Sequence, residues 1–176
     1  KWGTERKVAD TFEGYDFPII RYAEVLLNYA EAMYELGTTG KALDDALNIS
    51  LNLVRLRVNP DMPKLTTSFA SENSLNMREE IRRERTIELY NEGFRVDDLK
   101  RWNTAIVEMP KPILGVKWTG TDFATSWAGA SNMAKDSDGC LILENSRRWG
   151  GKNDLYPLPV DQCQLNPNLG QNPGWQ

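Results

Sequence analysis

The sequence contains no histidine and only two cysteines, and it lacks any long apolar run. The absence of histidine excludes Ser-His-Asp and Cys-His triads, HExxH metal sites and a histidine proton shuttle. Cys140 and Cys163 are too few for a thiolate zinc cluster and lack CxxC spacing; they are either bridged or remain two thiols. No run of about 18 apolar residues is present, so we expect no membrane-spanning helix in these residues. We therefore expect no cofactor and no metal.

The remaining composition is that of an ordinary globular protein with a mild negative charge. The chain has 176 residues, of which 26% are charged and 10% aromatic, and its net charge is −4. This length suits one domain with a real core, and we interpret residues 1–176 as a single domain. The acidic balance opposes nucleic-acid binding, for which a basic patch should dominate. Because the chain begins at Lys1 without a starting methionine or an apolar signal segment, we expect it to be a piece of a longer protein or a processed product.

Residues 18–59 carry two amphipathic helical patterns. The stretch "IIRYAEVLLNYAEAMYELG" has apolar residues at i, i+3 and i+4 and ends at Gly37, and a second pattern runs from Lys41 to about Val58. Two helices joined by a turn resemble one tetratricopeptide unit. A single unit cannot bury both of its faces. We therefore expect either that the neighbours lie in an absent N-terminal part or that the later helix substitutes for them. Without the N-terminal part, we expect an exposed apolar face that drives dimerisation.

Residues 74–103 are predicted to form a charge-rich helix pair. Between Glu79 and Trp102, thirteen of 24 residues are charged, seven acidic and six basic. A helical wheel places several of these charges on the same side as Ile81 and Leu89, and buried charges must be paired because each costs several kcal/mol alone. Asn76, three residues before Glu79, is a candidate N-cap. The predicted structural ion-pair network comprises Glu84, Arg85, Glu88, Glu92 and Arg95. Further candidate partners are Arg55, Arg57, Arg82 and Arg83.

The same glutamates have an alternative reading as the acid and base of a glycoside hydrolase. So many arginines nearby would lower the pKa of a glutamate and spoil it as an acid. We therefore predict that the protein is not an enzyme. Loss of activity in Glu84→Gln and Glu88→Gln with an unchanged fold would support the hydrolase instead.

Residues 104–176 are predicted to be loops followed by an extended, proline-rich tail, with "CLILE" as a short strand. Aromatic side chains among polar residues suit a carbohydrate-facing loop, although tryptophans in long loops more often serve as anchors. The candidate ligand-binding residues are Trp118, Phe123, Trp127 and Trp149. Trp102 and Trp175 are assigned to packing. "DSDG" at Asp136–Gly139 is interpreted as a polar turn, because it lacks the full ladder of a calcium loop.

Three separated blocks resemble the C-terminal part of the SusD/RagB family: "IIRYAEVLLNYAEAMYELG", "IRRERTIELYNEGFRVDDLKRW" and "LYPLPVDQCQLNPNLGQNPGW". They occur in the family's order and cover about a third of the chain. The resemblance implies a mainly α fold, with the tetratricopeptide-like hairpin and the charge-rich helix pair as scaffold and a long loop-rich C-terminal region.

The resemblance also implies a role. Such proteins are outer-membrane surface lipoproteins of Bacteroidetes that bind a glycan without catalysis and pass it to a SusC-like TonB-dependent transporter. Their lipid anchor would lie outside this segment, and we expect this segment to be mostly scaffold. Two alternatives stay open: an oligopeptide ligand, as in a RagB-like role, and a protein-interaction module that uses the helical hairpin.

Overall fold

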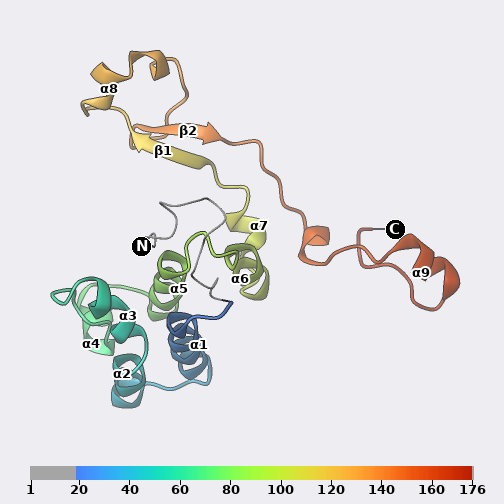
Figure 1. The fold of residues 1–176 in the computed structure, drawn as a ribbon, viewed down its shortest axis with the longest axis horizontal. Helices are drawn as coiled ribbons and strands as arrows, with labels where there is room; N and C mark the ends of the chain where they lie inside the picture. Colours follow the sequence, from blue (N-terminus) through green and yellow to red (C-terminus); the bar gives the residue numbers. More distant parts are fainter. Residues whose placement is uncertain (1–18, 176) are drawn as a thin grey trace, which may run out of the picture. The chain divides into compact units, whose positions relative to one another are not determined.

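The computed structural model describes residues 19–175, and the chain forms two compact units, Lys1–Gly93 and Phe94–Gln176. Both units are drawn in Figure 1, where the labels identify the elements. Helices predominate over strands among the described residues, which confirms the predicted mainly α fold. The interpretation of residues 1–176 as one domain stays a prediction.

The first unit is a set of helices packed around leucine and alanine side chains. Helix α1 contacts α2, α3 and α5, and α5 also contacts α3. The helices are α1 (Tyr22–Glu35), α2 (Gly40–Asn48), α3 (Leu51–Val58), α4 (Thr67–Glu72) and α5 (Met77–Glu88). Helix α1 ends before Gly37, whose φ of +81° is the left-handed conformation that glycine adopts without strain. The core side chains include Leu27, Leu47, Leu51, Leu65 and Ile81.

The second predicted helix, from Lys41 to Val58, is interrupted at Ile49–Ser50 and becomes α2 and α3. The Ser50 hydroxyl donates to the backbone oxygen of Ala46 at 2.6 Å. A serine that bonds back to the residue four positions earlier competes with the helical backbone. Apolar residues keep helical spacing on both sides of the break. The spacing of apolar residues alone therefore did not predict that the helix is interrupted.

Polar side chains fix the connections of the first unit. Asn76 caps α5, since its Oδ1 accepts from the Glu79 backbone N–H at 3.3 Å, and this confirms the predicted cap. Thr66 caps α4 in the same way by accepting from Phe69 N–H. The buried Asn52 side chain accepts from Leu65 N–H at 2.7 Å and donates to its carbonyl at 3.0 Å. These bonds hold the connection between α3 and α4 against the core.

The second unit combines short helices with one antiparallel hairpin. Its elements are α6 (Arg95–Arg101), α7 (Ala105–Glu108), β1 (Ile113–Lys117), α8 (Phe123–Ser126), η2 (Ala128–Ala130), β2 (Cys140–Glu144), η3 (Gly151–Asp154) and α9 (Val160–Leu165). In the hairpin, Leu114 pairs with Ile142 and Lys117 with Cys140. "CLILE" is the predicted strand, whereas β1 was not predicted because Gly115 and the two prolines that precede the strand, Pro110 and Pro112, weaken its pattern.

The proline-rich tail is held by amide side chains. Gln171 Oε1 accepts from Leu158 N–H at 2.7 Å, and Gln171 Nε2 donates to the Leu158 carbonyl at 2.8 Å. Asn172 Nδ2 donates to the Tyr156 carbonyl at 2.6 Å. Proline interrupts regular backbone pairing, so side-chain amides satisfy the backbone groups in its place.

Candidate functional site: an exposed aromatic platform

The loop that joins β1 to β2 is closed at its base by Trp118 and Gly139. Trp118 is only 6% exposed, and its backbone N–H donates to the Gly139 carbonyl at 2.8 Å. Gly139 has a φ of +81°, and a Cβ placed on it would lie 2.5 Å from the Thr119 Cβ. Only glycine fits this position. The base therefore fixes where residues 119–138 leave the hairpin and return to it.

Two aromatic rings lie together on this loop and face solvent. Phe123 and Trp127 stand at i and i+4, at opposite ends of α8, with ring centroids 5.3 Å apart and planes tilted by 45°. Their side chains are 40% and 56% exposed. We call this pair the aromatic platform. Adjacent exposed rings offer apolar faces to the C–H groups of a ligand.

A carboxylate precedes the platform directly in the chain. The side chain of Asp122 is exposed, and no described residue donates a hydrogen bond to its carboxylate. Asp122 therefore keeps its acceptor oxygens for ligand hydroxyls. Two exposed rings that follow such a carboxylate in the chain suit a ligand with C–H faces and hydroxyl edges.

The four predicted ligand-binding residues differ in their exposure and in their surroundings. The structure brings Phe123 and Trp127 together in the platform, whereas Trp118 is an anchor with little surface left for a ligand. Trp149 lines a separate cavity with Tyr156 and Trp175. Tyr156 was not among the residues predicted from the sequence to bind a ligand, and Trp175 was assigned to packing. The sequence does place Tyr156 close to Trp149. Only seven positions separate the two aromatic residues, and Gly150 and Gly151 between them favour a turn.

The segment Asp136–Gly139 is a turn closed by its own first carboxylate. Asp136 Oδ1 accepts from the backbone N–H of Asp138 at 3.0 Å and of Cys140 at 2.8 Å. Within residues 19–175 no group of three or more histidine, cysteine, aspartate or glutamate side chains is placed to hold a metal ion. Cys140 and Cys163 are both free thiols.

The charged residues of α5 form ion pairs with other helices of the first unit. Glu84 lies 3.1 Å from Arg55 of α3, and both side chains are less than 10% exposed. Glu88 pairs with Arg21 at 2.5 Å and with Arg57 at 2.8 Å, and Arg21 also reaches Glu92 at 2.8 Å. Arg21 was not among the partners expected from the sequence. Arg21 lies just before α1, and it comes within reach of Glu88 and Glu92 only because α1 packs against α5.

Two members of the predicted network have other surroundings. The buried Arg85 donates to Asn28 Oδ1 of α1 at 2.7 Å. Arg95 belongs to the second unit and lies 3.9 Å from Glu108. We call the first-unit set Arg21, Arg55, Arg57, Glu84, Arg85, Glu88 and Glu92 the charge cluster.

From the sequence we expected neighbouring arginines to lower the pKa of the glutamates in α5. For Glu84 that expectation is wrong. Burial raises the pKa of Glu84 above its ordinary value, and Arg55 only partly offsets that effect. A raised pKa alone does not make an acid catalyst, because a catalytic carboxyl must reach a substrate. Glu84 is 7% exposed and lines neither the Trp149 cavity nor the groove described next. Its surroundings are those of a buried ion pair.

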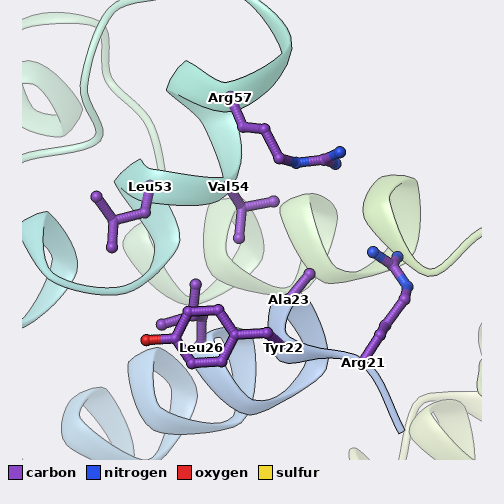
Figure 2. Close-up of a pocket in the computed structure, with 7 residues that line it drawn as sticks. All are labelled: Arg21, Tyr22, Ala23, Leu26, Leu53, Val54 and Arg57. Atoms are coloured by element: carbon purple, nitrogen blue, oxygen red, sulfur yellow. The ribbon is translucent and has the colours of Figure 1, made fainter. Parts of the chain in front are cut away.

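A groove of about 380 Å³ opens between the start of α1 and α3 (Figure 2). Tyr22 and Leu26 line it from α1 and Leu53 and Val54 from α3, with the guanidinium groups of Arg21 and Arg57 near one end. Both arginines already bind Glu88. The groove therefore offers apolar contact and few free donors, which does not suit a hydroxyl-rich sugar.

None of the helices in the described part of the chain has the length and apolar character needed to cross a membrane.

The chain is similar to proteins of one family. The model of the SusD family matches residues 3–175. A SusD-like carbohydrate-binding protein from Bacteroides fragilis NCTC 9343 is 31% identical, with a TM-score of 0.64 over 87% of this chain. A second SusD-like protein from the same organism is 28% identical, with a TM-score of 0.59 over 93% of this chain. This chain spans only 28% of the length of each of those proteins. No curated protein matches.

Proposed function

This chain belongs to the SusD family, and on that premise we propose that it is part of a non-catalytic glycan-binding protein of the bacterial outer membrane. The protein would capture an oligosaccharide at the cell surface and pass it to a SusC-like TonB-dependent transporter. A lipid anchor outside residues 1–176 would hold it at the membrane. Family membership supports each of these steps.

The observation that carries glycan binding within this chain is the aromatic platform. Soluble domains usually bury rings of this size or leave them singly at the surface, whereas here two lie adjacent and exposed on a loop with a fixed base. Their 45° tilt makes a shallow angle between two faces, which suits successive rings of a curved saccharide. The charge cluster and its helices would serve as scaffold.

A glycan array with the 176-residue chain, followed by titration with the best ligand, tests this proposal. We expect one family of neutral or acidic glycans to bind, and Trp127→Ala to weaken the binding about tenfold or more. Tyr22→Ala is the matched control, since Tyr22 is a 70% exposed aromatic residue of the first unit. Equal binding by wild type and Trp127→Ala would exclude the platform as the site, and an empty array would reject glycan binding by this chain.

The groove of Figure 2 favours a second candidate function, a protein-interaction module. Its apolar lining and exposed Tyr22 would accept the apolar face of a partner's helix. Under this alternative the control variant Tyr22→Ala, and not Trp127→Ala, would abolish capture of the partner. An oligopeptide ligand at the platform would instead show as a binding peptide that Trp127→Ala releases.

A further inference from the structure

A second aromatic surface in the unit Phe94–Gln176 differs from the platform because it carries a cation. Helix α6, the segment around η3 and the end of the tail enclose a cavity of about 250 Å³. Its lining includes Val96, Lys100, Trp149, Asn153, Tyr156 and Trp175. This volume is smaller than pockets for drug-sized ligands, which span about 300–1,000 Å³, so it suits one ring-sized unit. We call it the Lys100 cavity.

Hydrogen bonds hold both tryptophans of the Lys100 cavity. Trp149 Nε1 donates to Asp154 Oδ1 at 2.9 Å, and Trp175 Nε1 donates to the carbonyls of Lys152 at 2.8 Å and Leu155 at 3.0 Å. Because each indole N–H already has an acceptor, these side chains offer a ligand only their ring surfaces. The rings form a preorganised wall.

Gly174 allows the tail to approach this wall closely. Its φ is +83°, and a Cβ built on it would lie 2.7 Å from the Lys152 Cβ. Any larger residue would push the preceding and following backbone away from Lys152. The position of Trp175 in the cavity therefore depends on glycine at position 174.

Lys100 supplies the positive charge. Its Nζ lies 4.2 Å from the ring centroid of Tyr156 and 5.7 Å from that of Trp149. Cation–π attraction stabilises the ammonium there but uses none of its N–H donors as conventional hydrogen bonds. Within residues 19–175 no carboxylate or carbonyl oxygen accepts from Lys100. Its three donors remain available.

The carboxylates closest to Lys100 in the chain and beside the cavity do not neutralise it. Asp98 accepts from Arg101 at 2.9 Å, and Asp154 accepts from Trp149. Asp97 is exposed, and none of the three lines the cavity. An anion that enters would meet the ammonium without displacing an existing ion pair.

Asn153 adds a second donor. Its Oδ1 accepts from the Gly150 backbone N–H at 2.8 Å, which leaves the Nδ2 group to donate into the cavity that it lines. The lining thus combines aromatic rings with two donor groups and no carboxylate. A neutral sugar can accept from both donors through its hydroxyl oxygens, but only the carboxylate of a sugar acid adds charge-assisted hydrogen bonds to the Lys100 ammonium.

We propose that the Lys100 cavity binds one uronic-acid unit of a saccharide, with the carboxylate at Lys100 and Asn153 and the ring against the aromatic wall. This inference rests on the proposed function for the saccharide class of the ligand, and it uses a site independent of the aromatic platform.

Titration calorimetry with trigalacturonate and its fully methyl-esterified form tests the proposal. The two probes share the same sugar rings and differ in charge. We expect trigalacturonate to bind about tenfold more tightly, because a charge-assisted hydrogen bond is lost on esterification. Lys100→Gln should abolish that preference, and Lys152→Gln should keep it. Lys152 is the matched control, since its Nζ also lies over an indole, 4.7 Å from the Trp175 ring, but outside the cavity lining.

Asn153→Asp provides a second variant in case Lys100→Gln disturbs the packing of Tyr156. It places a negative charge at the cavity and should reduce trigalacturonate binding while the ester binds as before. Added salt should weaken the acid and leave the ester unchanged.

Equal affinity for the two probes, or a preference that survives Lys100→Gln, would overturn the proposal. If neutral glycans bind through Trp127 while trigalacturonate does not bind, this inference fails and the proposed function stands. If no saccharide binds, both fail. Binding of triglutamate in place of trigalacturonate would assign the Lys100 cavity to acidic peptides and overturn the saccharide.

Discussion

The two units of this chain differ in the polar contacts that hold most of their segments in place. In the first unit, charged side chains of α5 pair with arginines of α3 and of the residue before α1. In the second unit, amide and indole side chains bond to backbone carbonyl and N–H groups, as Gln171 does to Leu158 and Trp175 to Lys152. The difference follows from the backbone. Helices satisfy their own backbone groups, so only side chains remain to pair, whereas irregular segments leave backbone groups that side chains must satisfy.

From this difference we infer that the first unit serves as scaffold and that the second unit carries the surfaces for a ligand. Ion pairs between helices fix the first unit but occupy the donors and acceptors that a ligand would need. In the second unit the polar side chains hold loops in place and leave aromatic faces, Asp122 and Lys100 available. Substitutions in the first unit should therefore change stability, and substitutions in the second unit should change binding or local order.

Arg85→Ala should have the largest effect on stability. It removes a charged residue that is 5% exposed, together with its hydrogen bond to Asn28 Oδ1 of α1, and leaves the charge cluster without one of its buried cations. We expect a loss of about 3–5 kcal/mol in the free energy of unfolding, measured by urea denaturation. Arg78→Ala is the control, because the side chains of Arg78 and its partner Glu35 are 48% and 40% exposed; it should cost about 1 kcal/mol or less. Equal losses in both variants would show that burial of the charge cluster is unimportant.

Gln171→Ala should have an intermediate effect confined to the second unit. It removes both bonds to Leu158 and leaves half-buried backbone groups without partners. We expect a loss of about 1–3 kcal/mol and faster amide exchange at Leu158. Gln164→Ala, an exposed glutamine in α9, should change neither quantity. Unchanged exchange in Gln171→Ala would mean that the prolines alone hold the tail.

Glu84→Gln should change how stability depends on pH. Burial raises the folded pKa of Glu84 above its ordinary value of 4.5, so the folded state binds the proton more tightly than the unfolded state does. The stability that Glu84 contributes is present below pH 4.5 and is lost as the pH rises through the folded pKa. Relative to Glu84→Gln, the wild-type protein should therefore lose stability between pH 4.5 and pH 7. A difference between the two proteins that stays constant over this range would contradict the raised pKa.

Lys41→Ala should have the smallest effect. Lys41 pairs with Asp45 one turn later, but their side chains are 85% and 62% exposed. Exposed pairs of this kind contribute about 0.5 kcal/mol or less. A loss above 1 kcal/mol, measured by the same denaturation, would show that charge matters in the first unit regardless of burial.

The helices were largely predictable because local signals define them. Asn76 and Gly37 mark helix ends by their own chemistry, and apolar spacing marks α1 and α5. The break at Ser50 was not predictable, because a serine hydroxyl can bond to solvent or to its own helix with no change in sequence pattern.

The sites were only partly predictable because burial decides the role of each aromatic residue. Trp118 and Trp127 both lie among threonine, serine and glycine residues in the sequence, yet Trp118 is 6% exposed and Trp127 is 56% exposed. Lys100 falls within a charge-rich helix, where nothing in the sequence distinguishes it from its neighbours. Its contact with Tyr156 joins residues 56 positions apart, and only the folded chain brings them together.

Hydrogen–deuterium exchange of the intact protein, with and without the best oligosaccharide from the array, tests most directly whether scaffold and binding surface are separate. We expect slower exchange in residues 119–138 on addition of the sugar, while helices α1 to α5 exchange as before. Protection in those helices with no change in residues 119–138 would contradict that expectation.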